Sequence, residues 1–388
     1  MKLTYDYLHM TSNVDRADVQ SIWMLKIRLL SLGLAITGPT REFLAAHSRM
    51  PKRVRSGASG GLDVVLPCGI WVNCPTNERF ADSSPLLLRL DKDRFTIFDS
   101  ELGQEIPVEV MPNPAYTGQL TSHGVPMGLI AQISGDRLGI GIMSNCYFWN
   151  NAELRCKFCS IGFNVNNELP QKGTQQILET VDAAFSDPVR PARHLLLSTG
   201  TTEEPDRGAM IVAEVAKEIR KRYDFPIYAM VAAPRDLTYI EVLKDSGIDE
   251  LGMNLEVYDN TVASSVIPGK YRLIGTECYL EALEYAVNVF GPINTRSVLI
   301  AGLGEPASTV RGALHLASLG VMPIICPLRP LSGTDFEHTR PPDATTLMRV
   351  CVDAQQAISQ YQMPLGPTCI PCQNNCLTVP EHPAYRYY

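Results

Sequence analysis

Three cysteines stand close together in residues 146–160, which read CYFWNNAELRCKFCS. Their spacing is C-x9-C-x2-C, and a second group, Cys369, Cys372 and Cys376, lies in the segment CIPCQNNC. Thiolates bind zinc and iron–sulfur clusters, and a set of three protein ligands leaves one coordination position open for a substrate or cofactor. The two cysteine groups are therefore candidate metal sites.

The first group, Cys146, Cys156 and Cys159, fits iron better than zinc. A zinc ion held by three thiolates would need a fourth ligand nearby, but none of the seven histidines lies in this loop, and the sequence has no H-E-x-x-H pattern. A [4Fe–4S] cluster with one open iron is the better chemical fit. Zinc stays open as the alternative, and metal analysis separates the two.

Composition is that of a globular protein without a nucleic-acid footprint. The 388 residues are 45% hydrophobic and 19% charged, with a net charge of −7. The first residues lack the basic and apolar segments of a signal peptide, and no apolar run is long enough to span a membrane. We therefore expect a cytoplasmic protein that binds neither nucleic acid nor membrane. In that compartment the eleven cysteines indicate metal or redox chemistry rather than disulfides.

From residue 137 onward, short apolar strands alternate with amphipathic helices. The pattern predicts strands at 137–145, 194–199, 227–232, 250–257, 295–302 and 322–328, and helices near 172–186, 207–222, 236–246, 272–290 and 306–319. This alternation is typical of parallel strands joined by right-handed helical crossovers. Six units are too few for a closed eight-stranded barrel, so we expect a partial barrel whose active site lies at the carboxyl ends of the strands. The first cysteine loop leaves such an end.

The predicted fold class is α/β, a partial (β/α)6 barrel with additions at both ends. We expect an N-terminal α+β domain at 1–130, the barrel at 131–335, and a helix (344–360) with a short cysteine-rich extension at 336–388. Helical periodicity at 19–32 and 39–47 and several short strands define the first domain. No motif in that domain identifies a ligand.

A three-cysteine loop after the first strand of a partial βα barrel resembles the radical SAM superfamily. The common family spacing is C-x3-C-x2-C, so the loop here is a variant, although Phe158 keeps the aromatic residue that usually precedes the last cysteine. The resemblance implies a [4Fe–4S] cluster whose open iron binds the amino and carboxylate groups of S-adenosylmethionine. It also implies reductive cleavage to a 5′-deoxyadenosyl radical that abstracts hydrogen from a substrate, and an electron donor such as flavodoxin or ferredoxin.

Other strand ends match the family in order. STGTTEEP after the second strand resembles the turn that meets the amino and carboxyl groups of S-adenosylmethionine, and GMNLEVYD ends the fourth strand. VLIAGLGE resembles the adenine motif G-x-I-x-G-x-x-E with its first glycine replaced, and PLRPLSGT resembles the closing segment beside the adenine. The cofactor-binding residues implied by this resemblance are Gly200, Thr201, Glu203, Asn254, Glu256, Ile300, Gly302, Glu305 and Arg329.

The C-terminal group, Cys369, Cys372 and Cys376, predicts an auxiliary iron–sulfur cluster, with a fourth ligand from the substrate or from Cys351, Cys68 or Cys74. A zinc knuckle and uncoordinated thiols are the alternatives. Two clusters favour sulfur insertion into a small-molecule or acyl substrate, as in relatives of biotin and lipoyl synthases. A radical SAM dehydrogenase, lyase or mutase is the next hypothesis, and a zinc-stabilised non-catalytic binding protein is the hypothesis of another class. No polar side chain is predicted to act as the hydrogen abstractor.

Overall fold

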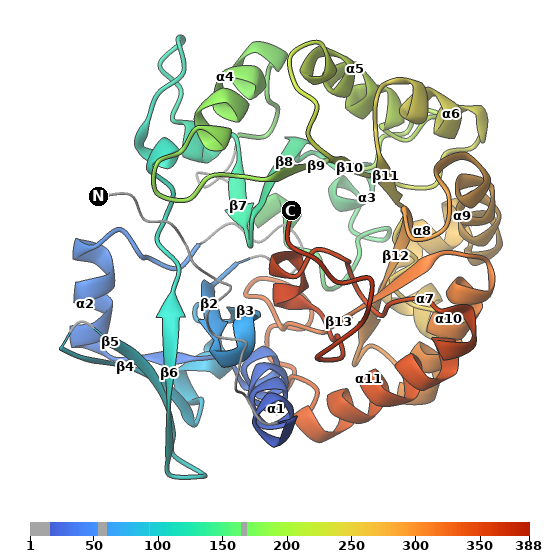
Figure 1. Cartoon of the computed structure of the whole chain (residues 1–388). Coiled ribbons are helices and arrows are strands. Elements are labelled where there is room, and N and C mark those ends of the chain that lie inside the picture. Colours follow the sequence, from blue (N-terminus) through green and yellow to red (C-terminus); the bar gives the residue numbers. More distant parts are fainter. Residues whose placement is uncertain (1–15, 53–59, 93, 164–168) are drawn as a thin grey trace.

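The computed structural model describes residues 16–388 apart from 53–59, 93 and 164–168 (Figure 1). The described chain forms a six-stranded sheet from its N-terminal third and a seven-stranded sheet from the rest. One hydrophobic core runs from the first helix through both sheets to the C-terminal segment. Within the described part of the chain, every helix is too short or too polar to span a bilayer.

The seven-stranded sheet contains the predicted parallel strands in their predicted order. They are β8 (Arg137–Met143), β9 (His194–Thr199), β10 (Ile227–Met230), β11 (Glu250–Gly252), β12 (Thr295–Ala301) and β13 (Met322–Pro327), and each pairs with the next in parallel. A short strand, β7 (Gln132–Ser134), pairs antiparallel with β8 at one edge. The sheet curls into an open barrel (Figure 1), so the predicted α/β partial barrel is confirmed.

Amphipathic helices cover the outer face of this curled sheet (Figure 1). They are α4 (Thr174–Phe185), α5 (Ala209–Arg220), α6 (Thr238–Asp245), α9 (Thr276–Phe290) and α10 (Pro306–Ser318), with the short helices α3 (Tyr147–Asn150), α7 (Asn260–Val266) and α8 (Pro268–Leu273) in the loops. Each long helix buries one apolar face against the strands, as its periodicity predicts.

Two predicted boundaries differ from the structure for local reasons. The strand predicted at 250–257 ends at Gly252, because the Leu255 N–H donates to Ser297 Oγ and not to a backbone carbonyl. Pairing with β12 resumes at Glu256, which forms an isolated bridge to Leu299 with a left-handed φ of 66°. The helix predicted at 272–290 is split, because α8 ends at Leu273 and Gly275 takes a φ of 88° before α9 begins. Glycine adopts that conformation without a steric cost.

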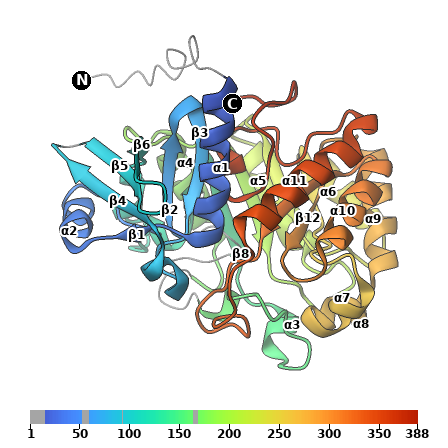
Figure 2. The ribbon, with the colours of Figure 1, turned by 90° about the horizontal axis from the view of Figure 1, so that it is seen from below.

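The N-terminal sheet lies beside the open edge of the barrel. Its strands are β1 (Ala35–Ile36), β2 (Leu62–Leu66), β3 (Ile70–Cys74), β4 (Leu86–Asp91), β5 (Arg94–Asp99) and β6 (Gln104–Val110), with helices α1 (Arg16–Leu32) and α2 (Gly38–Ala46). The strand order is β1-β4-β5-β6-β2-β3. Helix α1 packs against β3 and against α11 (Ala344–Ile358), and it lies between the sheet and the barrel in Figure 2.

The C-terminal segment that follows α11 fills the open side of the barrel (Figure 1). The backbone N–H of Leu377 donates to the Ile325 carbonyl on β13 at 2.7 Å, which extends the edge of the sheet. From α1, Trp23 Nε1 donates to the Thr378 carbonyl at 2.5 Å, and Lys26 Nζ donates to the Gln373 carbonyl at 2.8 Å. The segment is therefore fixed on both sides by hydrogen bonds to elements far away in the sequence.

A buried carboxylate, Asp63 on β2, connects the two halves of the molecule. Its Oδ2 accepts from Lys52 Nζ at 2.9 Å, from Arg190 Nη2 at 2.6 Å and from the backbone N–H of Gly135 at 3.3 Å. Its Oδ1 accepts from Asn374 Nδ2 at 3.1 Å. Burial raises the pKa of Asp63, but Lys52 and Arg190 outweigh that effect and hold the pKa well below its usual range.

We predict that Asp63→Asn destabilises the protein strongly, because the change leaves Lys52 and Arg190 buried without their shared counter-charge. The expected loss in the free energy of unfolding at pH 7 is on the order of 3–5 kcal/mol. Because the folded-state pKa of Asp63 is depressed, its contribution is present above the unfolded-state pKa of about 3.9 and is lost as the pH falls below it. The difference in the free energy of unfolding between the wild type and Asp63→Asn should therefore shrink below about pH 4.

Urea unfolding followed by circular dichroism measures this difference. Asp91→Asn, at an exposed position on β4, is the matched control and should leave the transition midpoint unchanged. Equal midpoints for Asp63→Asn and Asp91→Asn at pH 7 would contradict the role of the buried carboxylate.

Candidate functional site

A cavity of about 370 Å³ lies within the curled sheet. Alternate residues of the strands line it, such as Gly139 and Gly141 from β8, Ser198 from β9 and Val298 and Ile300 from β12. Side chains alternate between the two faces of a strand, so these positions share the inner face. The cavity reaches from the carboxyl ends of the strands to the C-terminal segment.

The first cysteine loop closes the carboxyl end of the cavity. The backbone N–H of Tyr147 donates to the Thr201 carbonyl at 2.8 Å, which ties the loop to the end of β9. The N–H of Cys159 donates to the Cys156 carbonyl at 3.1 Å and forms a tight turn. Cys156 and Cys159 each interact electrostatically with the other two thiols of the loop, including Cys146. The loop thus gathers the three cysteines that the sequence predicts as ligands.

The surroundings of Cys156 and Cys159 favour the neutral form of these two thiols. Burial raises the pKa of the Cys156 thiol well above its usual range and raises the pKa of Cys159 to about 11. Cys156 and Phe158 pack against an apolar cluster that includes Val257, Val266 and Ile267. Because a metal binds thiolates, binding at this loop must displace protons from these sulfur atoms.

The turn after β9 brings Gly200 against the cysteine loop. A Cβ atom at Gly200 would lie 2.1 Å from the Asn145 carbonyl oxygen and 3.0 Å from Cys146 Cα, so only glycine fits there. Thr201 contributes its carbonyl to the loop, as described above, whereas Glu203 is exposed. The predicted turn after β9 therefore positions the 146–159 loop through backbone contacts of Gly200 and Thr201.

Asn254 lines the cavity beyond the end of β11 and has an unpartnered oxygen. Its Nδ2 lies 3.4 Å from Met230 Sδ, while its buried Oδ1 has no hydrogen-bond partner. Thr202 Oγ1, in the turn after β9, is also buried without a partner. Buried acceptors without partners are costly, so both oxygens are suited to a ligand that donates hydrogen bonds.

Glu256 also lines the cavity, and its carboxylate pairs with Lys270 Nζ at 2.9 Å. Lys270 donates in addition to the Asn254 carbonyl at 3.2 Å. Burial lowers the pKa of Lys270, but Glu256 outweighs that effect, and the net shift is upward. Sequence reasoning missed Lys270, because a lone lysine in SVIPGKYRL belongs to no motif.

The residues predicted from the fifth and sixth strands occupy different environments. Gly302 has a φ of 101°, and a Cβ there would lie 2.2 Å from Pro342 Cγ, so it packs against the chain before α11. Glu305 is exposed immediately before α10. Arg329 is buried, and its guanidinium donates to the Gly60 carbonyl at 2.7 Å and to the Asn73 carbonyl at 2.9 Å. The Arg329 guanidinium is therefore already hydrogen-bonded to the N-terminal part of the chain.

The cavity collects some of the predicted residues and leaves others outside its lining. The residues on its wall are Cys159, Gly200, Asn254, Glu256, Ile300, Arg329, Cys372 and Cys376. The described residues that do not line it are Cys146, Cys156, Thr201, Glu203, Gly302, Glu305 and Cys369.

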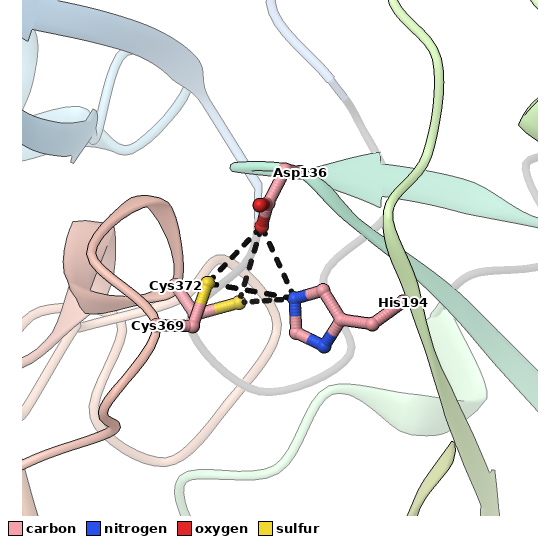
Figure 3. Close-up of side chains that lie close together, drawn as sticks. All are labelled: Asp136, His194, Cys369 and Cys372. Atoms are coloured by element: carbon pink, nitrogen blue, oxygen red, sulfur yellow. Dashed lines mark hydrogen bonds and ion pairs between the residues drawn. The ribbon is translucent and has the colours of Figure 1, made fainter. Parts of the chain in front are cut away.

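The C-terminal cysteines lie at the opposite end of the cavity, by the amino ends of β8 and β9. Cys369 and Cys372 meet Asp136 and His194 there (Figure 3). Cys376 lies outside this group, and its Sγ is 3.6 Å from the Gln373 carbonyl. Sequence reasoning missed Asp136 and His194, because only the pairing of β8 with β9 brings them together.

Comparison with known proteins agrees with this architecture. Residues 147–317 match the model of the Radical SAM superfamily. A curated relative, the bacteriochlorophyllide c C-7(1)-hydroxylase of Chlorobaculum limnaeum, is 25% identical over 246 residues, which cover 56% of this chain and 60% of the relative. The chain thus matches less than two thirds of that enzyme's length.

Solved structures with a similar chain path include methylornithine synthase and the [FeFe]-hydrogenase maturase HydG. Methylornithine synthase is 15% identical with a TM-score of 0.46, covering 60% of this chain and 64% of its own. HydG is 16% identical with a TM-score of 0.44, covering 60% and 53%. The matched family model begins one residue after Cys146 and contains the rest of the cysteine loop. The family model over residues 147–317 and the curated relative, which is an enzyme, support a radical SAM superfamily enzyme.

Proposed function

We propose that Cys146, Cys156 and Cys159 bind a [4Fe–4S] cluster and that S-adenosylmethionine binds beside it, against the carboxyl ends of β9, β11 and β12. The observation that carries this proposal is the convergence of the cysteine loop, Gly200 and Asn254 at one end of the cavity. The residues fit such a cofactor, because the loop supplies three thiols and Asn254 Oδ1 is buried without a donor.

The protein's own groups position and shield the reacting centre. When bound, the cluster and S-adenosylmethionine supply a 5′-deoxyadenosyl radical that abstracts hydrogen. Gly200 lets the cysteine loop approach β9, and Lys270 holds Glu256 and the Asn254 backbone in place. Asn254 Oδ1 accepts a hydrogen bond from an amino or hydroxyl group of the ligand. An electron donor such as flavodoxin or ferredoxin completes the system.

The substrate of this proposal is a small molecule or acyl group that lies in the cavity. The cavity volume of about 370 Å³ is within the range of small-molecule sites, and aliphatic side chains such as Leu129, Leu196 and Ile324 supply much of its wall. An apolar wall keeps water away from a reactive radical. Residues 1–130 and 336–388 act in this proposal as separate units that close the open side of the barrel at 131–335.

Two classes of product, one with an inserted sulfur atom and one with a new hydroxyl group, each have an observation in their favour. Sulfur insertion follows from the C-terminal cysteines and requires a second cluster as the sulfur donor. Hydroxylation of a carbon is the activity for which the relative from Chlorobaculum limnaeum is named. It would require an acceptor for one electron from the substrate radical and water as the source of the oxygen atom. Both start with hydrogen abstraction, and the mass of the product separates them, because one adds a sulfur atom and the other an oxygen atom. A dehydrogenase removes hydrogens, and a mutase leaves the mass unchanged.

We predict that Cys156→Ala removes the iron of the cysteine loop and abolishes formation of 5′-deoxyadenosine from S-adenosylmethionine under dithionite. The wild-type loop should hold about four irons per chain. Iron analysis and chromatography of the nucleoside products measure both effects after anaerobic reconstitution.

Cys278→Ala is the matched control, since Cys278 is exposed on α9 and lies outside the cavity wall. It should retain both the iron and the cleavage activity. Wild-type cleavage in Cys156→Ala would show that the 146–159 loop does not hold the catalytic cluster.

A second prediction concerns the close approach of β9 to the loop. Gly200→Ala should lower the iron content several-fold, because the added methyl group would displace Asn145 and Cys146. Overpacking of this kind costs about 1–3 kcal/mol, which is less than the typical folding stability of about 5–15 kcal/mol. Iron analysis of the folded variant tests the effect. Gly118→Ala should keep the wild-type iron content, because a Cβ atom there meets nothing within 4 Å. Equal iron content in the two variants would contradict this explanation.

A further inference from the structure

We propose that Asp136, His194, Cys369 and Cys372 bind one zinc ion at the amino ends of β8 and β9. Among the described residues, this is the group of histidine, cysteine and carboxylate side chains whose ligand atoms come together closely enough for a single ion. The four atoms lie within 4.8 Å of one another. The side chains point toward a common centre in Figure 3.

Five distances between ligand atoms are close to the edges of a zinc tetrahedron, and three of them are slightly shorter. Cys369 Sγ lies 3.2 Å from Asp136 Oδ1 and 3.5 Å from His194 Nε2. Cys372 Sγ lies 3.7 Å from the same oxygen and 3.2 Å from the same nitrogen, and oxygen and nitrogen are 3.1 Å apart. Bonds of about 2.3 Å to sulfur and about 2.0–2.1 Å to nitrogen and oxygen give tetrahedral edges of about 3.3–3.8 Å.

The ligand types and their spacing also point to zinc. Cys369 and Cys372 are separated by two residues at the start of a short 3-10 helix (Pro371–Asn375), and C-x2-C is a common half of structural zinc sites. Two thiolates and one carboxylate around Zn²⁺ and a neutral imidazole leave one negative charge. The guanidinium of Arg137 interacts with Cys369, Cys372 and Asp136, and it supplies the compensating positive charge.

A single ion explains the arrangement better than an iron–sulfur cluster does. In a cluster the ligands bind different irons, so their atoms lie farther apart than the ligands of one ion. Cys376, which a three-cysteine cluster would need, stays outside the group beside the Gln373 carbonyl. Four protein ligands leave no position open, which is the pattern of structural zinc. One zinc ion carries no sulfide, so this assignment removes the sulfur donor that insertion requires.

The position of the site defines its role. Asp136 and His194 belong to the barrel, whereas both cysteines belong to the C-terminal segment, and Cys372 lines the cavity. The ion would therefore cross-link that segment to the barrel and close the end of the cavity opposite the 146–159 loop. Tyr388 packs on the His194 ring with 4.7 Å between ring centroids, so the last residue covers the site.

Zinc and iron analysis of the full-length protein, purified without chelators under anaerobic conditions, tests the proposal. We expect about one zinc per chain in the wild type and near zero in His194→Ala and Cys372→Ser. Both variants should keep the iron of the 146–159 loop, whereas Cys156→Ala should keep zinc and lose iron. This reciprocal pattern distinguishes failure of the zinc site from failure of the proposed radical chemistry.

Cys376→Ser is the matched control in the same segment and should keep its zinc, because Cys376 is not a ligand. If His194→Ala does not fold, as judged by circular dichroism, the tetrahedral absorption of a cobalt-substituted wild-type protein and its loss in Cys369→Ser decide the question. The proposal is overturned if the wild type lacks zinc after incubation with a zinc salt. It is also overturned if Cys372→Ser and Cys376→Ser lose iron together, which would indicate a second cluster.

Discussion

The Asp63 carboxylate is the buried charge on which the assembly of the molecule depends. It binds Lys52 and Arg190, which bring together the chain before β2 and the chain between α4 and β9, and it accepts from Gly135 and Asn374. Breaking a buried ion pair leaves uncompensated charge in a medium that solvates it poorly. The N-terminal sheet, the barrel and the C-terminal segment therefore have one favourable arrangement around this carboxylate.

The same interactions shape the end of the cavity. Gly135 precedes Asp136, and Asn374 follows Cys372 by two residues, so the bonds to Asp63 hold both sides of the proposed zinc site. Lys26 on α1 fixes the same segment through the Gln373 carbonyl. A carboxylate on β2 thus influences a site whose ligands all come from other parts of the chain.

The barrel separates two sulfur-rich ends. Parallel strands place the 146–159 loop at their carboxyl ends and the C-terminal cysteines at their amino ends, with the cavity between them. Glycines at 139 and 141 on β8 leave space along its wall, because they have no side chain to fill the interior. In the proposed function, a substrate attacked at one end of this cavity would have its other end against the C-terminal segment.

The sequence by itself determined the features that depend on short-range pattern. Apolar runs and helical periodicity predicted the six parallel strands and the helices between them, and the predicted end of the first strand placed the 146–159 loop at a strand end. The end of the strand at Gly252 and the break between α8 and α9 were not predicted, because a side-chain hydrogen bond to Leu255 and the backbone conformation of Gly275 decide them.

Only the tertiary structure decided which distant side chains meet. Cys369 and His194 are 175 residues apart, and Arg329 reaches Asn73 across 256 residues. Lys270 and Glu256, which form a salt bridge, are 14 residues apart and belong to no shared motif. Spacing along the chain reports the local periodicity of strands and helices, whereas these contacts follow from the strand order and from the pairing of buried charges when the chain folds.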